Sequence, residues 1–288
     1  MPSETETIRP NLSLTDVSKV WLQTRLIGIE KIAEKDVLTI YGDIVPGVDI
    51  RVRMAIEGLK DTRRETLLVI LHTLGGVVEE VRNIVQILRH HYDYVHFLVP
   101  VHAMSAGTVL AMSGDKIYMD YFSRLGPVDP QIQTGNDIVP ALSYLHQYKE
   151  LIEKSEKGQL SSAEFVLLNK LDLAQLHRIE LAAKLSVSLI NDWLTKYRFR
   201  DWKKNNIPVR EQEKRRRAEE IAEALNDHKK WHTHGYSIHK DILEQDIGLQ
   251  IDDYSTDSNL KQAVWGYFWP LLEYTGEMPS FIHGREFI

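Results

Sequence analysis

Short apolar runs alternate with amphipathic segments through the first half of the chain. Runs typical of buried strands occur at residues 37–41, 67–71, 95–101 and 116–119. Between residues 77 and 88, apolar side chains recur at helical spacing. Strands that alternate with helices indicate an α/β fold with parallel strand pairing. The order of these elements alone does not fix how the sheet is wound.

The second half of the chain has a mainly helical pattern. Helices are predicted over residues 140–154, 161–197 and 218–225, with a charged linker at 203–217. Residues 1–14 are polar and acidic, and we expect them to be disordered. The chain is therefore divided into a disordered N-terminal tail (1–14), an α/β core domain (15–200) and a C-terminal helical extension (201–288).

Two strand–turn–helix units in tandem carry the candidate chemistry. HTLGG (residues 72–76) follows the strand 67–71, and Ser105 with Ala106 follows the strand 95–101. Paired glycines turn tightly and bring backbone N–H groups close to a ligand. A serine between a strand and a helix lies where an acyl-transfer nucleophile is needed. One turn can supply an oxyanion donor, and the other a nucleophile with the N–H of Ala106 as second donor.

Four segments of the sequence carry a family resemblance. HTLGG is followed by AMSAGT (103–108), LGPVDPQ (125–131) and WHTHGYSI (231–238). In this order they resemble the serine dehydrogenase proteinase family, an SppA-like branch of the Clp protease/crotonase superfamily. The resemblance implies a Clp protease/crotonase-like spiral of ββα units and homo-oligomers built as trimers or rings. It also implies a serine peptidase that cleaves peptides or unfolded proteins.

The resemblance assigns roles to the two turns. Ser105 would attack a peptide carbonyl, and the N–H groups of Gly75 or Gly76 and of Ala106 would hold the oxyanion. The substrate strand would lie along the exposed backbone edge beside the Gly-Gly turn. The alternative is that Ser105 is only a small residue required by a tight turn.

The proton acceptor is less well defined, although a serine hydroxyl near its ordinary pKa needs one. Clp peptidases use a histidine soon after the serine, but residues 128–131 contain none, so that triad does not carry over. SppA-like relatives use a lysine in the following helix, where this chain has His146, with Lys149 three residues on. A histidine needs no shift of its pKa to act as a base. His177, or no competent base, stays open as well.

Composition excludes several classes of site and partner. The 288 residues carry a formal net charge of −6, which gives no overall attraction for nucleic acid or membranes. There is no cysteine, so disulfides and thiolate sites are excluded. No apolar run reaches the roughly 18–20 residues of a spanning helix, and the N-terminus lacks a signal-peptide pattern. We expect a cytoplasmic protein without a membrane or nucleic-acid partner.

Other signals have simpler interpretations. Four histidines cluster near the end of the chain (His228, His232, His234 and His239), but no HExxH-type pattern accompanies them, so no metal is expected. No G-x-G-x-x-G occurs, so no nicotinamide or other cofactor is expected. His72 is predicted to order its turn by hydrogen bonding. Asp129 and Gln131 either bound the cleft, contact another subunit or serve the turn.

Two other functions remain as alternatives. The chain could be a non-catalytic scaffold that binds peptides or assembles complexes, and Ser105 would then be unreactive toward acylating probes. A crotonase-type enzyme acting on an acyl-thioester would not need Ser105 and would place an acidic residue in its pocket. The Ser-Ala-Gly turn argues against this second alternative.

Overall fold

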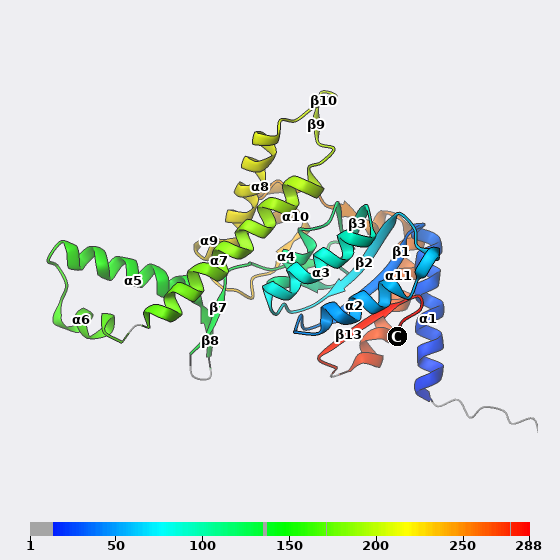
Figure 1. Ribbon diagram of the computed structural model, residues 1–288, viewed down its shortest axis with the longest axis horizontal. Coiled ribbons are helices and arrows are strands. Elements are labelled where there is room, and N and C mark those ends of the chain that lie inside the picture. Colours follow the sequence, from blue (N-terminus) through cyan, green and yellow to red (C-terminus); the bar gives the residue numbers. More distant parts are fainter. Residues whose placement is uncertain (1–13, 135–136, 171, 277) are drawn as a thin grey trace, which may run out of the picture.

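A six-stranded sheet forms the centre of the computed structural model, which describes residues 14–134, 137–170, 172–276 and 278–288 (Figure 1). The strand order is β12-β5-β3-β2-β1-β13, and all neighbours are parallel except β13, which is antiparallel to β1. The strands are β1 (Asp36–Gly42), β2 (Thr66–His72), β3 (Tyr94–Leu98), β5 (Lys116–Met119), β12 (Asp252–Asp253) and β13 (Ser280–Gly284). The predicted α/β class and parallel pairing are confirmed.

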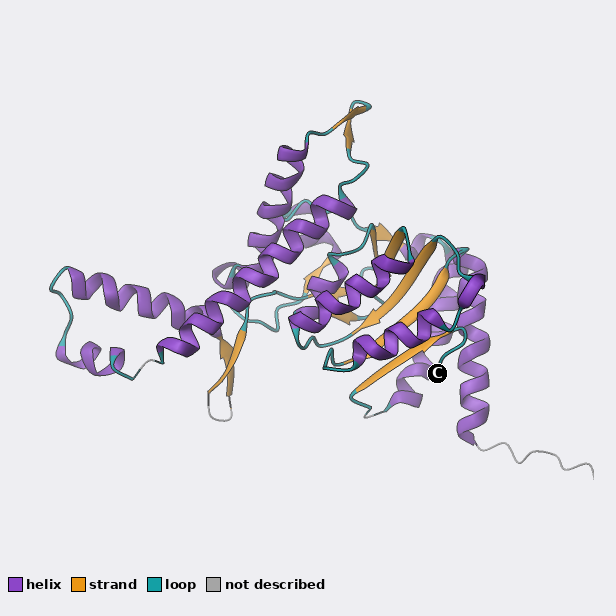
Figure 2. Cartoon of the chain, viewed as in Figure 1, coloured by secondary structure: helices purple, strands orange, loops and turns teal. Residues whose placement is uncertain are grey.

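Helices cover both faces of this sheet (Figure 2). Helices α2 (Val48–Glu57), α3 (Val78–His91) and α4 (Ala106–Ala111) pack on one face, and α1 (Leu14–Ala33) and α11 (Ser258–Thr275) on the other. Alternate residues of β2 from Leu67 to Leu71 belong to the two cores, and these five are all buried. Because both faces are covered, β2 is continuously apolar rather than alternating.

A helical region extends away from the sheet (Figure 1). It follows the hairpin of β7 (Gln131–Thr134) and β8 (Asp137–Pro140), and its helices are α5 (Ala141–Glu156), α6 (Ser162–Leu168) and α7 (Leu173–Trp193). The helical region predicted over residues 161–197 is thus divided between α6, α7 and η2 (Leu194–Arg198). The α7 helix has its own N-cap, because the Asp172 carboxylate accepts the N–H groups of Ala174 and Gln175.

The charged segment predicted as a linker is partly helical. A short hairpin of β9 (Lys203–Lys204) and β10 (Ile207–Pro208) is followed by α8 (Glu211–Asn226), which begins before the predicted residue 218. Arg215 pairs with Glu211 at 3.4 Å and Arg216 with Glu220 at 3.8 Å, each one helical turn apart. Such pairs support a helix whose exposed face is charged.

The C-terminal segment also completes the sheet. Besides its helices it supplies β12 and β13, the two edge strands. The domain boundary at residue 200 stays a prediction, and residues 1–13 of the predicted tail lie outside the described residues. Within the described ranges no helix is long and apolar enough to cross a membrane. The remaining elements are η1 (Lys60–Thr62), η2 (Leu194–Arg198), α9 (His228–Trp231), α10 (Lys240–Gln245) and η3 (Tyr254–Thr256).

A small three-stranded sheet positions the candidate site. It consists of β4 (His102–Ala103), β6 (Arg124–Leu125) and β11 (Ile238–His239), with β4 parallel and β11 antiparallel to β6. An isolated bridge between Thr73 and Ala103 joins this small sheet to the carboxyl end of β2. The Gly-Gly and serine turns therefore emerge side by side.

Candidate active site

Ser105 lies between β4 and α4 with a strained backbone. Its φ of 51° and ψ of −118° lie in a region that residues with a side chain rarely occupy. The turn is held by two hydrogen bonds: Met104 N–H donates to Thr73 O (2.9 Å), and Gly107 N–H donates to Met104 O (2.8 Å). The half-buried Ser105 side chain has no hydrogen-bond partner among the described residues. Its hydroxyl is thus left uncommitted.

The two glycines of the first turn are required by their surroundings. Gly75 and Gly76 have φ values of 123° and 143°. A Cβ on Gly75 would lie 2.9 Å from the Ser105 Cβ and 3.3 Å from the Ala106 nitrogen. A Cβ on Gly76 would lie 2.1 Å from the Ile44 carbonyl oxygen. The Gly-Gly turn is therefore in direct contact with the serine turn.

The backbone donors of the two turns differ in availability. Gly75 N–H already donates to the Thr73 hydroxyl at 2.9 Å. In the part of the chain that the structure describes, the N–H groups of Gly76 and Ala106 have no acceptor. Of the donors considered, Gly76 and Ala106 are thus the pair that is available to an oxyanion.

The short α4 helix is fixed tightly behind Ser105. The buried Thr108 hydroxyl lies 2.8 Å from Ala103 O and 2.9 Å from Gly126 O, and it accepts the Gly126 N–H at 3.0 Å. A Cβ on Gly107 would lie only 2.3 Å from the Thr73 Cγ2. The serine turn is therefore anchored to both β2 and β6.

The segment that carries these turns is similar to a known family. Residues 51–180 match the ClpP-like SDH-type serine proteinases. This match confirms the resemblance that HTLGG, AMSAGT and LGPVDPQ carry, since all three motifs fall inside it.

Two curated relatives of this chain are the uncharacterized proteins MJ0137 and MJ1495 of Methanocaldococcus jannaschii. The first is 46% identical over 63 residues, which cover 22% of this chain and 22% of the relative. The second is 35% identical over 99 residues, covering 34% of this chain and 30% of the relative. The chain thus spans less than a third of the length of these relatives.

Three solved structures show partial similarity. A mutant of the 1510-N membrane-bound stomatin-specific protease is 22% identical and covers 42% of this chain and 65% of that chain, with a TM-score of 0.33. Another mutant of the same protease, in complex with a substrate peptide, is 24% identical and covers 42% of this chain and 62% of that chain, with a TM-score of 0.34. The ClpP protease catalytic domain from Plasmodium falciparum is 14% identical and covers 39% of this chain and 60% of that chain, with a TM-score of 0.30.

Within the described residues, no hydrogen bond joins the predicted bases His146, Lys149 and His177 to Ser105. His146 lies on α5 with 41% of its side chain exposed; its Nε2 is 3.0 Å from Lys229 Nζ and its Nδ1 is 3.5 Å from the Glu150 carboxylate. Lys149 on α5 and His177 on α7 are exposed. The assignment of His146, Lys149 or His177 as the proton acceptor therefore stays a prediction.

A histidine–carboxylate pair was missed by the sequence analysis. Asp129 is 2% exposed, and its Oδ1 lies 2.9 Å from the His234 Nδ1, while Gln131 Nε2 donates to its Oδ2 at 3.0 Å. Asp129 follows β6 and His234 precedes β11, so the antiparallel pairing of these two strands brings together residues that 105 positions separate in the sequence. Both lie in segments that carry the family resemblance, which was the available signal.

His72 does not play its predicted role. No hydrogen bond of its ring occurs among the described residues, and the loop is instead ordered by the Thr73 hydroxyl. The His72 ring stacks on Tyr41 at 5.1 Å and lies 4.0 Å from the His102 ring. Burial, followed by the charges of His102 and Arg124, lowers the pKa of His72 to about 3.

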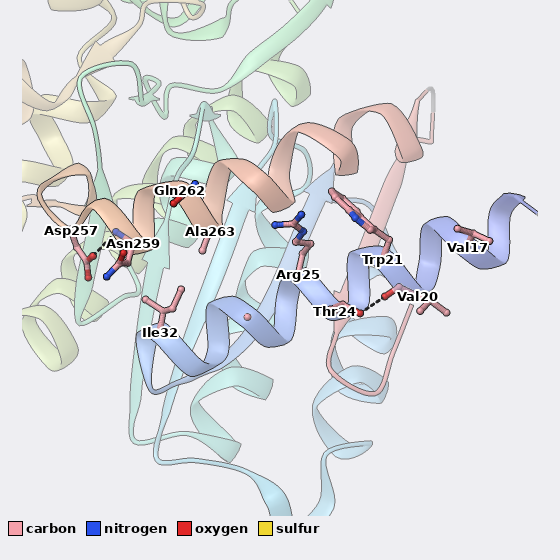
Figure 3. Close-up of a pocket in the computed structure, with 11 residues that line it drawn as sticks. Val17, Val20, Trp21, Thr24, Arg25, Ile32, Asp257, Asn259, Gln262 and Ala263 are labelled. Atoms are coloured by element: carbon pink, nitrogen blue, oxygen red, sulfur yellow. Dashed lines mark hydrogen bonds between the residues drawn. The ribbon is translucent and has the colours of Figure 1, made fainter.

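A surface groove of about 1220 Å³ lies elsewhere, between α1 and α11 (Figure 3). Its lining includes Val20, Trp21 and Ile32 from α1 and Gln262 and Ala263 from α11, but no residue of the two turns. This groove is therefore not part of the candidate active site. Among the described residues, no group of three or more histidine, aspartate or glutamate side chains is arranged to hold a metal ion.

Proposed function

We propose that the chain is a serine peptidase in which Ser105 forms an acyl-enzyme and the N–H groups of Gly76 and Ala106 hold the oxyanion. The observation that carries this proposal is the contact of the two turns. Ser105 has a strained backbone and an uncommitted hydroxyl, and it adjoins two backbone donors that lack an acceptor within the described chain. The match to ClpP-like SDH-type serine proteinases supports the same chemistry.

The reaction follows from these groups. The Ser105 Oγ bonds to the substrate carbonyl carbon, its proton passes to a base, and the carbonyl electron pair moves to the oxygen between the two N–H groups. Collapse of this intermediate breaks the C–N bond, and the base returns the proton to the leaving amine. Water then releases the acyl group by the same steps. Each oxyanion donor is worth about a hundredfold to a thousandfold in rate.

For the proton acceptor, we keep His146 as the first proposal and Lys149 as the second. The structure adds His234, whose Nδ1 is held by the buried Asp129 and whose Nε2 has no partner among the described residues. Histidine is the side chain that most often serves as a general base near neutral pH. The base must reach Ser105 from the same subunit or from a neighbour in the proposed homo-oligomer, which we place in the cytoplasm.

The test is intact-mass analysis after treatment with a fluorophosphonate probe. Wild type and Ser258→Ala, a control at an exposed serine, should gain one adduct, and Ser105→Ala should gain none. His146→Ala, Lys149→Ala and His234→Ala, taken one at a time, then identify the base by loss of labelling rate. Absence of an adduct on folded, assembled wild type would overturn the peptidase proposal.

A non-catalytic peptide-binding scaffold is the second candidate. It is favoured by one observation, the absence of any hydrogen bond between Ser105 and a base in the described ranges. An unlabelled wild type that still binds unfolded peptides would support it. A crotonase-type enzyme is the third, and it predicts turnover of an acyl-thioester that survives Ser105→Ala.

A further inference from the structure

Five polar side chains form a row across five strands. Tyr41 and His72 are paired in register between β1 and β2, and Arg124 is paired with His102 of β4 and with His239 of β11. The ring distance of 4.0 Å between His72 and His102 joins the two sets. Laterally paired residues point to the same face of a sheet. We call Tyr41, His72, His102, Arg124 and His239 the anion row.

The row has more hydrogen-bonding capacity than the protein uses. Neither ring nitrogen of His102 has a hydrogen-bond partner among the described residues, although both atoms are buried. The Arg124 guanidinium makes no hydrogen bond or ion pair in the part of the chain that the structure describes. The His239 Nδ1 lies 3.2 Å from Ser123 O, which leaves its Nε2 available. Polar groups held away from water without partners are costly, which favours a ligand that satisfies them.

The charge of the row is matched to an anion. Burial and then the Arg124 charge lower the pKa of His102 to about 4, and the pKa of His72 is lowered to about 3. At neutral pH these imidazoles are therefore uncharged N–H donors beside one permanent cation. The row itself contains no carboxylate. All five residues are half-buried, so each is partly exposed, although both ring nitrogens of His102 are themselves buried.

We propose that the anion row binds a carboxylate carried by the peptide substrate. His72 lies three residues before Gly75, and His102 lies three residues before Ser105. Three residues span at most about 10 Å, so the bound carboxylate lies within about three peptide residues of the scissile bond. The inference rests on the proposed peptidase function, and it adds a preference for an Asp or Glu side chain, or a free C-terminus, near the cleavage point.

The experiment measures peptide binding to the full-length Ser105→Ala protein by fluorescence anisotropy. Two matched peptides carry Glu or Gln at the same position, and a further pair has a free or an amidated C-terminus. A carboxylate peptide should bind about tenfold more tightly than its neutral partner. Arg124→Gln should abolish this preference, and Arg124→Lys should keep part of it. Arg82→Gln, at an exposed arginine of α3, should leave it unchanged.

His102→Phe provides a second variant that keeps a ring beside His72 but removes both nitrogens. It should weaken the carboxylate preference even if Arg124→Gln fails to fold. Equal affinity for the matched peptides, at every position within three residues of the bond, would overturn the proposal. Inorganic phosphate that binds in an Arg124-dependent way without any peptide preference would do the same, because it would make the row a site for free anions.

The binding readout is separate from the test of function. Failure of the peptidase proposal would appear as an unlabelled wild type in the fluorophosphonate experiment. Failure of the anion row alone would leave Ser105 reactive and the carboxylate preference absent.

Discussion

Substitution of Gly76 by alanine should both destabilise the protein and abolish the reactivity of Ser105 toward fluorophosphonate. The added Cβ would lie 2.1 Å from the Ile44 carbonyl oxygen, and the residue would keep a φ of 143° that disfavours side chains. Strain of this kind costs about 1–3 kcal/mol. Displacing Ile44 also weakens two hydrogen bonds, Ile44 N–H to Gly75 O and Val77 N–H to Ile44 O, both 2.8 Å. At about 1 kcal/mol each, they bring the expected loss of unfolding free energy to about 3–5 kcal/mol.

Three other glycines separate the contributions to this loss. Gly47 has a φ of 93° but nothing within 4 Å of an added Cβ, so Gly47→Ala measures backbone strain alone. Gly107 has no such φ but a contact of 2.3 Å with Thr73 Cγ2, so Gly107→Ala measures crowding alone. Gly28, within α1, has neither a positive φ nor an atom near an added Cβ, so Gly28→Ala should raise the free energy of unfolding by about 0.5–1 kcal/mol.

The assay is urea unfolding of the four variants and wild type, compared at equal m-value, with fluorophosphonate labelling on the same samples. We expect Gly76→Ala to lose more stability than Gly47→Ala and to lose labelling, whereas Gly47→Ala keeps it. If Gly76→Ala and Gly47→Ala cost the same, the close approach of the Gly-Gly turn to Ile44 is not a constraint. If Gly76→Ala is labelled at the wild-type rate, the Gly76 N–H is not an oxyanion donor.

Three further predictions concern buried polar groups. Asp115→Ala should lower the free energy of unfolding by about 3–5 kcal/mol, because it leaves the buried Arg89 guanidinium, 2.7 Å away and with 8% of its side chain exposed, without its carboxylate. The same change at the exposed Asp192 should lower the stability very little. Equal losses in urea unfolding would contradict the argument. Asp129→Asn should slow fluorophosphonate labelling if His234 is the base, with little change in stability, and an unchanged labelling rate would remove His234 from consideration. Burial lowers the pKa of His283 from 6.5 to about 4, so between these pH values the unfolded chain binds a proton that the folded chain does not. Stability should therefore fall from pH 6.5 to about 4, by up to about 1.4 kcal/mol per pH unit. In acid unfolding His283→Gln should reduce this slope, and an unchanged slope would exclude His283 as its source.

The core strands and the two turns could be predicted because their signals are local. The run 67–71 is apolar without interruption because both faces of β2 are covered, and the two glycines mark a turn by composition alone. The strands β12 and β13 gave no comparable signal. The β12 strand has only two residues, both aspartates, and its place depends on pairing with β5. Edge strands this short are set by tertiary contacts, so sequence pattern favoured a helical extension.

The sequence did not predict which of the two glycines has a free N–H group. The pattern HTLGG allows either glycine to present an N–H group, and both were retained as donors. The structure distinguishes them through one side chain, since the Thr73 hydroxyl accepts the Gly75 N–H at 2.9 Å. Gly76, whose flanking groups are bonded to Ile44, keeps its own N–H free of any acceptor in the described chain. That choice depends on the rotamer of Thr73, which composition and spacing do not encode.

The Asp129–His234 pair and the anion row are formed in the same way. Asp129 with His234, and His72 with His102 and Arg124, are brought together by strand pairing between distant segments. Neither set has a spacing that a motif could describe, because its members lie far apart in the sequence. His72, His102 and Arg124 are on three different strands, and Asp129 and His234 lie in the loops that follow β6 and precede β11. A short motif can place the nucleophile and its oxyanion donors, since these belong to two local turns. The groups that accept the proton and recognise the substrate depend on how the small sheet of β4, β6 and β11 joins the larger one.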